Sequence, residues 1–315
     1  MAECFAFRSF PYHLDFKSAK LHLLNVGLSP RDLREVLRAV FGGNLIIIDR
    51  STLAKLVCVM TYFYKAKNTK LVMPEFIFAE KASVRSRMRT KFWRIFLSSV
   101  DKVVVFSDYE VGYYAKLFRQ PPQKFHRIYY GEDMDGQNLG PFSDGYVFAS
   151  GRTDRDFVTL LDALRNLKVK GVIVADGRYR DVFREVPGNV EVYFDVTFER
   201  YKQYLMNSRL VVIPLAAGAS SRGQSTIVQA KKYGKPILCA DLPFSRDCFF
   251  NDFDGMIYYA PGNVDQLRDR IGELLSDSTK LKAIGECNYL EYMKYFNIRR
   301  FTDDYESLIM ELTAK

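Results

Sequence analysis

The second half of the chain alternates short apolar runs with segments in which apolar residues recur every three or four positions. The apolar runs are rich in β-branched residues and occupy residues 146–150, 171–175, 190–194, 209–215 and 235–240. Such runs, bounded by Gly, Asp or Pro, are typical of buried parallel strands. The helical period appears between them, at residues 156–167, 198–208 and 225–234. This alternation predicts βαβ units, and therefore a doubly wound sheet covered by helices.

The first half repeats the alternation less regularly. Its apolar runs predict strands within 20–27, 44–49, 70–76 and 101–107, and its helical patterns predict helices within 29–43, 52–65 and 80–99. Residues 136–145 are rich in Gly, Pro, Ser and Asn, which is typical of a linker. We therefore expect an α/β protein with two Rossmann-like doubly wound domains facing a central cleft. The predicted domains are 1–140 and 141–315, and the second ends in a helical tail.

The composition is consistent with a large buried core, and it also indicates the cellular compartment. Apolar residues make up 48% of the 315 residues, and aromatic residues 15%. The five cysteines are widely spaced and include no CxxC, which argues against a disulfide framework or a zinc site. The N-terminal segment lacks the pattern of a signal peptide, and no stretch of about 18 uninterrupted apolar residues occurs. These features predict a cytoplasmic protein that does not span a membrane.

The net charge of +9 is concentrated in the first half. Residues 1–144 carry 22 basic and 14 acidic side chains, whereas the remaining 171 residues carry 24 and 23. Within 81–100, apolar residues recur every fourth position, and six cations surround them without an acid: Lys81, Arg85, Arg87, Arg89, Lys91 and Arg94. This pattern predicts a helix that lies on an anionic membrane surface. In the alternative, the stripe Val84, Met88, Phe92 and Phe96 packs on the sheet and the cations are solvated. No recognised motif supports nucleic-acid binding, which we do not expect.

Two polar segments follow predicted strands of the second domain. The first, SGRTDRDF at 150–157, places Gly151, Arg152 and Arg155 after the first strand. Planar guanidinium groups at a strand end suit bidentate contacts to a diphosphate. A solvated loop with incidental arginines is the alternative interpretation.

The second segment, RGQSTIVQAKKYGKP at 222–236, joins a polar loop to a helix. Gly223 allows a close backbone approach, and Gln224, Ser225 and Thr226 lie where a helix begins and its N–H groups favour an anion. Gln229 lies one turn further, on the face that returns toward the cleft. The alternative is simple N-capping by Ser225, which leaves the long polar approach unexplained.

The order of these segments resembles the retaining GT-B nucleotide-sugar glycosyltransferases of the family 4-like group. The resemblance spans roughly residues 100–312 and rests on the order of DKVVVFSDYE, KFHRIYYGEDMDG, YVFASGRTDRDFVTLLDAL, GVIVADG, VEVYFDVTFERYKQYLMNSRLVVIPL, GQSTIVQAKKYGKPILCAD and DGMIYYAPGNVDQLRDRIGELLSD. It implies that Arg152, Arg155 and the amides of Ser225 and Thr226 hold the donor diphosphate. It also implies transfer of a sugar, with retention and without a metal or further cofactor, to a lipid-linked, glycan or protein acceptor.

The sequence departs from the family pattern at an acidic pair. The carboxylates that usually contact the donor sugar and the ribose are replaced by Ser221 and Gln229. The alternative function is therefore a catalytically weakened nucleotide-sugar-binding or scaffold subunit. A nucleotide-sugar epimerase fits less well, because we cannot place the carboxylates and the histidine that it would need. On the acceptor side, the first domain offers Glu75, Ser107 and His126 as cleft candidates. The alternative for His126, an isolated histidine near a strand, is a structural role.

Overall fold

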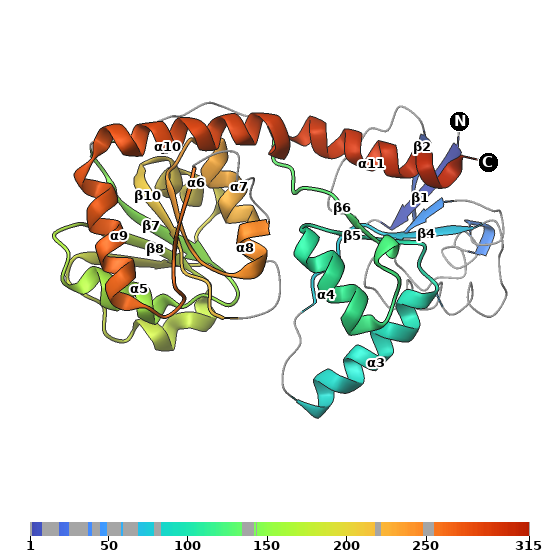
Figure 1. Cartoon of the computed structure of the whole chain (residues 1–315), viewed down its shortest axis with the longest axis horizontal. Coiled ribbons are helices and arrows are strands. Elements are labelled where there is room, and N and C mark those ends of the chain that lie inside the picture. The colour runs from blue at the N-terminus through green and yellow to red at the C-terminus, as the bar shows by residue number, and fades with distance from the viewer. Residues whose placement is uncertain are drawn as a thin grey trace. The chain divides into compact units, whose positions relative to one another are not determined.

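The computed structural model divides into two units, the first formed by Met1–Tyr129 and Arg299–Lys315 and the second by Tyr130–Ile298 (Figure 1). It describes residues 2–7, 19–24, 37–39, 45–48, 58, 69–78, 83–133, 142, 144–217, 222–247 and 255–314. Most of the helices predicted within 29–43 and 52–65, and most of the predicted linker, lie outside these residues. Both units carry a six-stranded sheet, and every strand pairing in both is parallel.

The sheet of the first unit has the order β2-β1-β3-β4-β5-β6. Its strands are β1 (Ala2–Phe7), β2 (Ala19–Leu24), β3 (Leu45–Ile47), β4 (Lys70–Met73), β5 (Lys102–Val105) and β6 (Phe125–Arg127). Figure 1 shows α3 (Val84–Ser98) and α4 (Asp108–Phe118) on one side of this sheet and α11 (Ile298–Thr313) on the other. Phe76 packs edge-on against Trp93 of α3 at 5.3 Å and against Tyr114 of α4 at 5.2 Å between ring centroids. An aromatic core therefore fixes both helices to the sheet.

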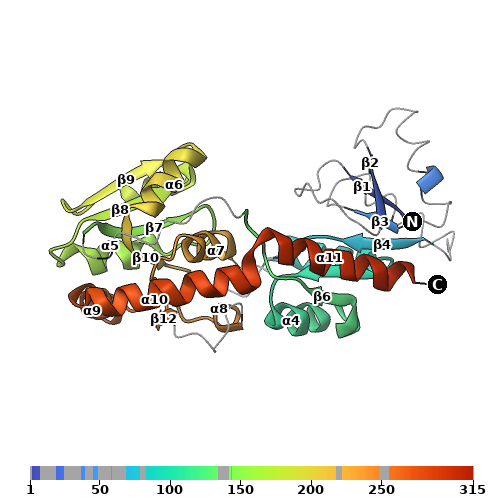
Figure 2. The same ribbon diagram turned by 90° about the horizontal axis from the view of Figure 1, so that it is seen from above.

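The sheet of the second unit has the order β12-β11-β10-β7-β8-β9. Its strands are β7 (Tyr146–Gly151), β8 (Gly171–Ala175), β9 (Val190–Phe194), β10 (Ser208–Ile213), β11 (Ile237–Ala240) and β12 (Met256–Tyr259). The chain winds outward from β7 in one direction and from β10 in the other, which is the doubly wound topology that the sequence predicts. Its helices are α5 (Phe157–Arg165), α6 (Phe198–Met206), α7 (Gln224–Lys232), α8 (Pro243–Asp247), α9 (Val264–Ser276) and α10 (Ser278–Glu291) (Figure 2).

The division into units differs from the predicted boundary at 140/141 in two ways. Residues 130–133 belong to the second unit, because Glu132 donates its N–H to Phe296 O at 2.9 Å and accepts from Ile298 N–H at 2.9 Å. The C-terminal helix α11 belongs to the first unit instead of forming a tail on the second. Tyr305 on α11 donates its hydroxyl to the carbonyl of Pro74, which follows β4. No helix among the described residues is both long and apolar enough to cross a membrane.

Candidate functional site

The two polar segments singled out in the sequence meet at the point where the winding of the second sheet reverses. Strands β7 and β10 are neighbours, and the loops that follow them pair through their backbones. Asp156 N donates to Pro214 O at 2.8 Å, and Ala216 N donates to Asp154 O at 3.0 Å. In doubly wound sheets, ligands bind outside the carboxyl ends of the strands at this switch point. The topology therefore brings both predicted motifs to one candidate site.

The side chain of Arg155 stabilises the loop after β7 through hydrogen bonds to backbone carbonyls. Its side chain is buried, and its Nε donates to Ser150 O and its Nη1 to Thr153 O, both at 2.9 Å. Gly151 has a φ of 154°, and a Cβ added there would lie 2.1 Å from Arg155 Nε. A glycine is therefore needed at 151, because any side chain would collide with the guanidinium. Arg155 was predicted to contact a diphosphate, and the structure uses two of its donors within its own loop.

Arg152, the other predicted arginine, is exposed at the carboxyl end of β7. It lies near Asp176, whose pKa is lowered first by hydrogen bonds from Arg178 and also by the positive charge of Arg152. Its guanidinium is thus available at the surface where a ligand would approach. A third arginine was not singled out from the sequence: Arg222 forms an ion pair with Asp154 and ties the loop before α7 to the loop after β7.

The start of α7 presents backbone amides at the switch point. Gly223 is the N-cap residue with a φ of 88°, and no side chain caps the helix. The interpretation of Ser225 as the capping residue is therefore wrong, since it lies exposed inside the first turn. Ile227 is the first residue whose N–H donates to the cap carbonyl, at 2.9 Å. The amides of residues 224–226 precede it, and such amides with the helix dipole favour an anion.

Gly223 and Arg155 also connect the two predicted motifs directly. A Cβ at position 223 would meet Arg155 Nη2 at 3.5 Å and Ile213 Cγ2 at 3.2 Å. Because Gly223 has no side chain, the α7 terminus lies close to the buried guanidinium. Thr226 is buried next to Tyr201 of α6, and burial raises the pKa of the Tyr201 hydroxyl to about 12. Tyr201 therefore stays protonated and can donate a hydrogen bond at neutral pH.

Gln229 has a partner that sequence reasoning missed. Its Nε2 donates to Glu132 Oε1 at 2.8 Å, although the two residues are 97 positions apart in the chain. Burial raises the pKa of the Glu132 carboxyl, and the hydrogen bond from Gln229 opposes that rise. A carboxylate thus lies beside Gln229 but comes from the segment that follows β6. Ser221, at the other position of the missing acidic pair, lies outside the described residues.

The three acceptor-side candidates all belong to the first unit. Glu75 follows β4 and is partly exposed. Ser107 caps α4: its hydroxyl accepts from Glu110 N at 3.2 Å, and Glu110 in turn accepts from Phe106 N at 3.0 Å. This arrangement gives Ser107 a structural role at the helix start.

His126 is the middle residue of β6. Burial lowers its pKa, and the charge of Lys102 lowers it further, while Glu311 and Asp304 on α11 act in the opposite sense. His126 therefore lies close enough to α11 for the carboxylates of that helix to affect its pKa. Within the described ranges, no three His, Cys, Asp or Glu side chains form a group that could hold a metal ion.

Comparisons with known proteins agree with the fold described above. No protein-family model matches the chain, and neither does any curated protein. Solved structures do match. Anabaena Alr3699/HepE in complex with UDP has a TM-score of 0.71 at 14% identity, over 99% of this chain and 100% of that chain. HepE has also been solved with UDP-glucose.

Two further structures match along almost their whole length. Sucrose-phosphate synthase (tll1590) from Thermosynechococcus elongatus has a TM-score of 0.74 at 12% identity, over 100% of both chains. A glycosyltransferase from Rickettsia africae ESF-5 has a TM-score of 0.65 at 12% identity, over 100% of this chain and 99% of that chain. The predicted fold class is thereby confirmed: the chain has two parallel sheets with flanking helices, the α/β fold of GT-B glycosyltransferases.

Proposed function

We propose that this protein transfers a sugar from a nucleotide diphosphate sugar to a lipid-linked, glycan or protein acceptor. The observation that carries the proposal is the switch point of the second unit, where the exposed Arg152 and the amide-bearing start of α7 follow adjacent strands. The presence of UDP and UDP-glucose in the HepE structures supports a nucleotide diphosphate sugar as the donor.

The chemistry of the proposed reaction follows from the charge that develops on the leaving group. When the bond from the anomeric carbon to the diphosphate breaks, negative charge grows on the diphosphate oxygens. Arg152 and the amides of Ser225 and Thr226 are suited to stabilise that charge, and the buried Arg155 holds the loop that carries Arg152. Preorganised donors of this kind lower the barrier because they need no rearrangement during the reaction.

Retention at the anomeric carbon and independence from metals are further parts of the proposal. Both rest on the resemblance in segment order. A cationic side chain and a helix terminus offer the diphosphate a positive environment, which supports a reaction without a metal or another cofactor.

A binding or scaffold subunit of the same fold is the second candidate function. The observation that favours it is Gln229, an amide where a ribose-binding carboxylate is expected, hydrogen-bonded to Glu132 at 2.8 Å. Such a subunit would bind the nucleotide diphosphate sugar but leave the sugar bond intact. Hydrolysis of the donor without an acceptor separates the two functions, because only an enzyme releases free sugar and nucleoside diphosphate.

We further propose that the protein works in the cytoplasm, at the periphery of a membrane. Cys58 and Cys239 are buried free thiols, which suits a reducing compartment. The surplus of basic residues in the first 144 positions supports an anionic partner for that part of the chain.

The test begins with binding and proceeds to turnover. Calorimetry with UDP, GDP, ADP and the corresponding monophosphates should give tighter binding of one diphosphate than of its monophosphate, by about tenfold or more, because the second phosphate meets the α7 terminus. The matching sugar nucleotides are then incubated with the protein, and release of free sugar is followed. Equal affinity for the monophosphate and diphosphate of every base would contradict the proposed donor site.

A further inference from the structure

Helix α3 presents two different apolar faces. One face is buried in the first unit and contains Trp93, Phe96 and Leu97. The other is exposed to solvent: Val84 is 69%, Met88 67%, Phe92 48% and Ile95 68% exposed. The exposed residues lie at positions i, i+4, i+8 and i+11 of the helix, so they form one continuous stripe, which we call the outer stripe. The stripe predicted from the sequence included Phe96, which the structure places in the core, while Ile95 completes the outer stripe.

The core holds α3 firmly, while every side chain of the outer stripe stays at least 48% exposed. Trp93 packs edge-on against Phe96 at 5.0 Å and against Phe76 at 5.3 Å. Lys124 donates its ammonium group to Leu97 O at 2.7 Å and to Val100 O at 2.5 Å, which satisfies carbonyls at the end of the helix. The outer stripe is therefore part of a preformed helix, so docking would not carry the free-energy cost of folding that helix.

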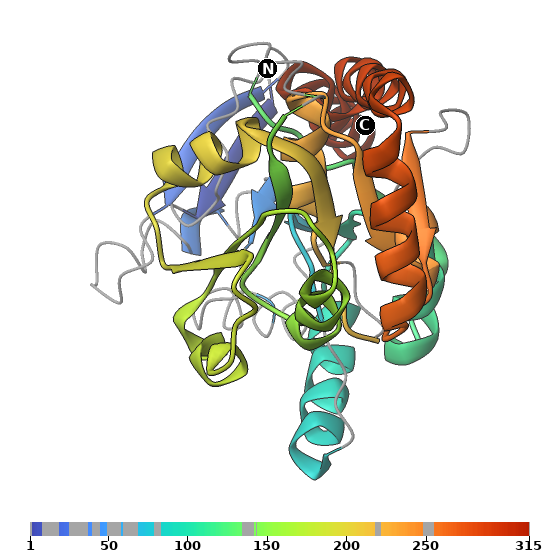
Figure 3. The ribbon, with the colours of Figure 1, turned by 90° about the vertical axis from the view of Figure 1, so that its left-hand side faces the viewer.

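Cations border the outer stripe on both sides. At 3.6 residues per turn, Arg87, Lys91 and Arg94 fall along one edge, and Arg85 and Arg89 fall along the other. Arg89 also lies over the Phe78 ring, 4.5 Å from its centroid. The helix contains no acidic residue. Figures 1 and 3 show one end of α3 extending beyond the other helices and strands drawn for its unit.

We propose that α3 docks the first unit on an anionic lipid surface, with the outer stripe in the acyl boundary and the bordering cations among the headgroups. An apolar centre between two rows of cations is complementary to a bilayer surface, which is apolar beneath a layer of negative charge. A second copy of α3 would instead bring like charges together on both edges. Nucleic acid would pair with the cations but leave the apolar stripe without a partner. The proposal rests on the proposed location at a membrane and names the surface that would reach it. It concerns only the first unit and does not depend on sugar transfer, so flotation tests it separately from donor binding.

The test measures flotation of the full chain with vesicles of phosphatidylcholine, with and without 40% phosphatidylglycerol, at about 50 and 500 mM salt. A charge variant carries Arg85→Gln, Arg87→Gln, Lys91→Gln and Arg94→Gln, and a stripe variant carries Met88→Ser and Ile95→Ser. The matched controls carry four exposed cations from elsewhere changed to Gln (Lys168, Arg184, Lys282 and Arg299), or Val158→Ser with Met310→Ser. Because all of these side chains are exposed or partly exposed, the variants should fold, and circular dichroism checks this.

The proposal expects the parent to float with anionic vesicles at low salt, with binding at least tenfold weaker at high salt, where charges are screened within about 3 to 10 Å. The charge variant should lose the salt-dependent part, the stripe variant should bind at least tenfold more weakly at low salt, and both controls should bind like the parent. Absence of flotation at low salt would overturn the proposal. So would equal binding of the stripe variant and its control, or a dimer in solution that Met88→Ser and Ile95→Ser abolish.

Discussion

The residues at the switch point divide into those that a ligand can reach and those that hold the loops. Arg152 is exposed, whereas Arg155 is buried and donates to one carbonyl at the end of β7 and to one in its own loop. Two arginines three positions apart therefore have different consequences when they are removed. This distinction follows from burial, which the spacing alone does not show.

Replacing Arg152 by alanine should weaken binding of the nucleoside diphosphate by about 1.5–3 kcal/mol, the range for charge-assisted hydrogen bonds. The free energy of unfolding should stay within about 0.5 kcal/mol of the parent, because the side chain is exposed. Calorimetry measures the first quantity and urea denaturation the second. Lys168→Ala, another exposed cation of this unit, is the control and should change neither. Unchanged affinity in Arg152→Ala would remove this arginine from the site.

Replacing Gly151 by alanine should destabilise the loop that follows β7. The added Cβ would lie 2.1 Å from Arg155 Nε, so the guanidinium must move and lose its bonds to Ser150 O and Thr153 O. We expect the free energy of unfolding to fall by about 2–4 kcal/mol in urea denaturation. The control is Gly112→Ala in α4, where a Cβ meets nothing within 4 Å. That change should raise stability by about 0.5–1 kcal/mol, since alanine favours a helix.

The pair of Glu132 and Gln229 predicts a dependence of stability on pH. Burial raises the pKa of Glu132 above its usual value of 4.5, so the folded state disfavours the ionised carboxyl. Its contribution to stability is therefore full below about pH 4.5 and is lost as the pH rises through the higher folded-state pKa. Glu132→Gln keeps an acceptor for Gln229 and removes this loss. Urea denaturation at pH 4 and pH 7 should show the variant gaining stability relative to the parent as the pH rises.

A substitution at the partner residue tests the same ionisation in the opposite direction. Gln229→Glu would place a second carboxylate where the amide now donates to Glu132 Oε1. Like charges at this distance raise both pKa values, so this variant should lose stability relative to the parent between pH 4 and pH 7. A relative stability that stays constant with pH in both variants would contradict an ionisable role for Glu132.

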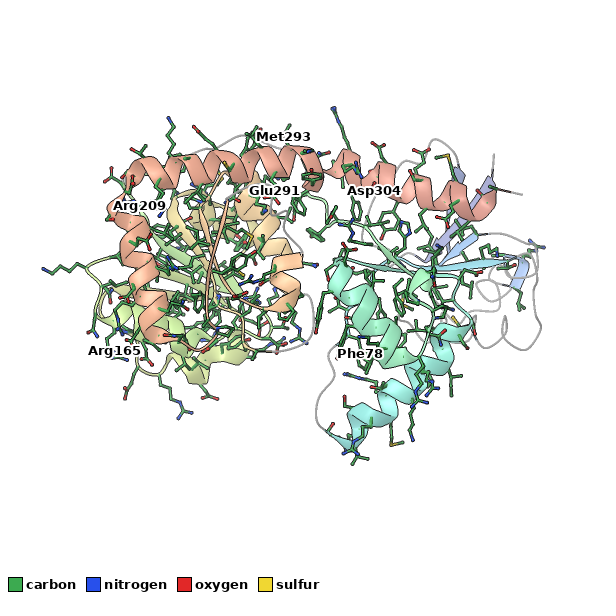
Figure 4. The ribbon with its side chains drawn as sticks, in the orientation of Figure 1. Phe78, Arg165, Arg209, Glu291, Met293 and Asp304 are labelled. Atoms are coloured by element: carbon green, nitrogen blue, oxygen red, sulfur yellow. The ribbon has the colours of Figure 1, made fainter. Side chains whose placement is uncertain are left out.

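At the scale of elements, a buried ion pair joins the site helix to its support. Lys231 on α7 and Glu291 at the end of α10 form an ion pair, with their side chains 0% and 1% exposed. Figure 4 shows Glu291 pointing into its unit, whereas the neighbouring Met293 points outward. The Lys231 ammonium also lies 5.1 Å from the centre of the Phe296 ring. Charged groups that are this deeply buried depend on each other.

Lys231→Met should therefore lower the free energy of unfolding by about 3–5 kcal/mol, because it leaves the Glu291 carboxylate buried without its partner. Combining it with Glu291→Leu should cost less than the sum of the two single changes, which a double-mutant cycle measures. The control is Lys282→Met in the exposed pair of Lys282 and Glu286 on α10, where we expect a change below about 1 kcal/mol. Strict additivity at 231 and 291 would show that the pair does not act as a unit.

The sequence predicts the elements of the second unit well for a physical reason. Buried parallel strands appear as uninterrupted β-branched runs, and the predicted runs at 146–150, 171–175 and 190–194 match β7, β8 and β9 within one residue. The segments at 150–157 and 222–236 were singled out because arginines follow an apolar run in the first, and a polar loop with a glycine leads into a helical pattern in the second. The topology brings them to one switch point, and the roles of their residues stay predictions. Strand β1 was not predicted, because its run AECFAF is short and is interrupted by Glu3.

Contacts between segments that are far apart in the chain could not be predicted from the sequence. Glu132 meets Gln229 across 97 positions, and no local period or propensity encodes such a pair. The roles of Arg155 and Ser107 likewise depend on burial and on hydrogen bonds formed only after folding. The predicted roles of Glu75 and His126 at an acceptor stay predictions.

At the scale of the whole molecule, the chain passes between the units twice. The first passage lies near Tyr129 and Tyr130, and the second near Ile298 and Arg299, so the last helix returns to the first unit. Helix α11 buries Phe301, Tyr305, Leu308 and Ile309, and Lys102 on β5 forms an ion pair with Glu311 at 3.0 Å. The first unit is therefore complete only when the C-terminal residues have been added. A linear assignment of domains along the sequence does not allow for this.

Because α11 belongs to the first unit, Tyr305→Ala should destabilise that unit selectively. Tyr305 is 1% exposed and donates its hydroxyl to Pro74 O, so its loss removes both aromatic packing and a buried hydrogen bond of the first unit. We expect a cost of about 3–5 kcal/mol in the stability of that unit. Hydrogen exchange followed by mass spectrometry should show faster exchange in β4, β5 and α11, while β7 and β10 keep their protection. Leu267→Ala on α9, also fully buried, is the reciprocal control and should speed exchange in the second unit alone. Equal acceleration in both units after Tyr305→Ala would show that they unfold as a single cooperative body and that α11 does not serve the first unit selectively.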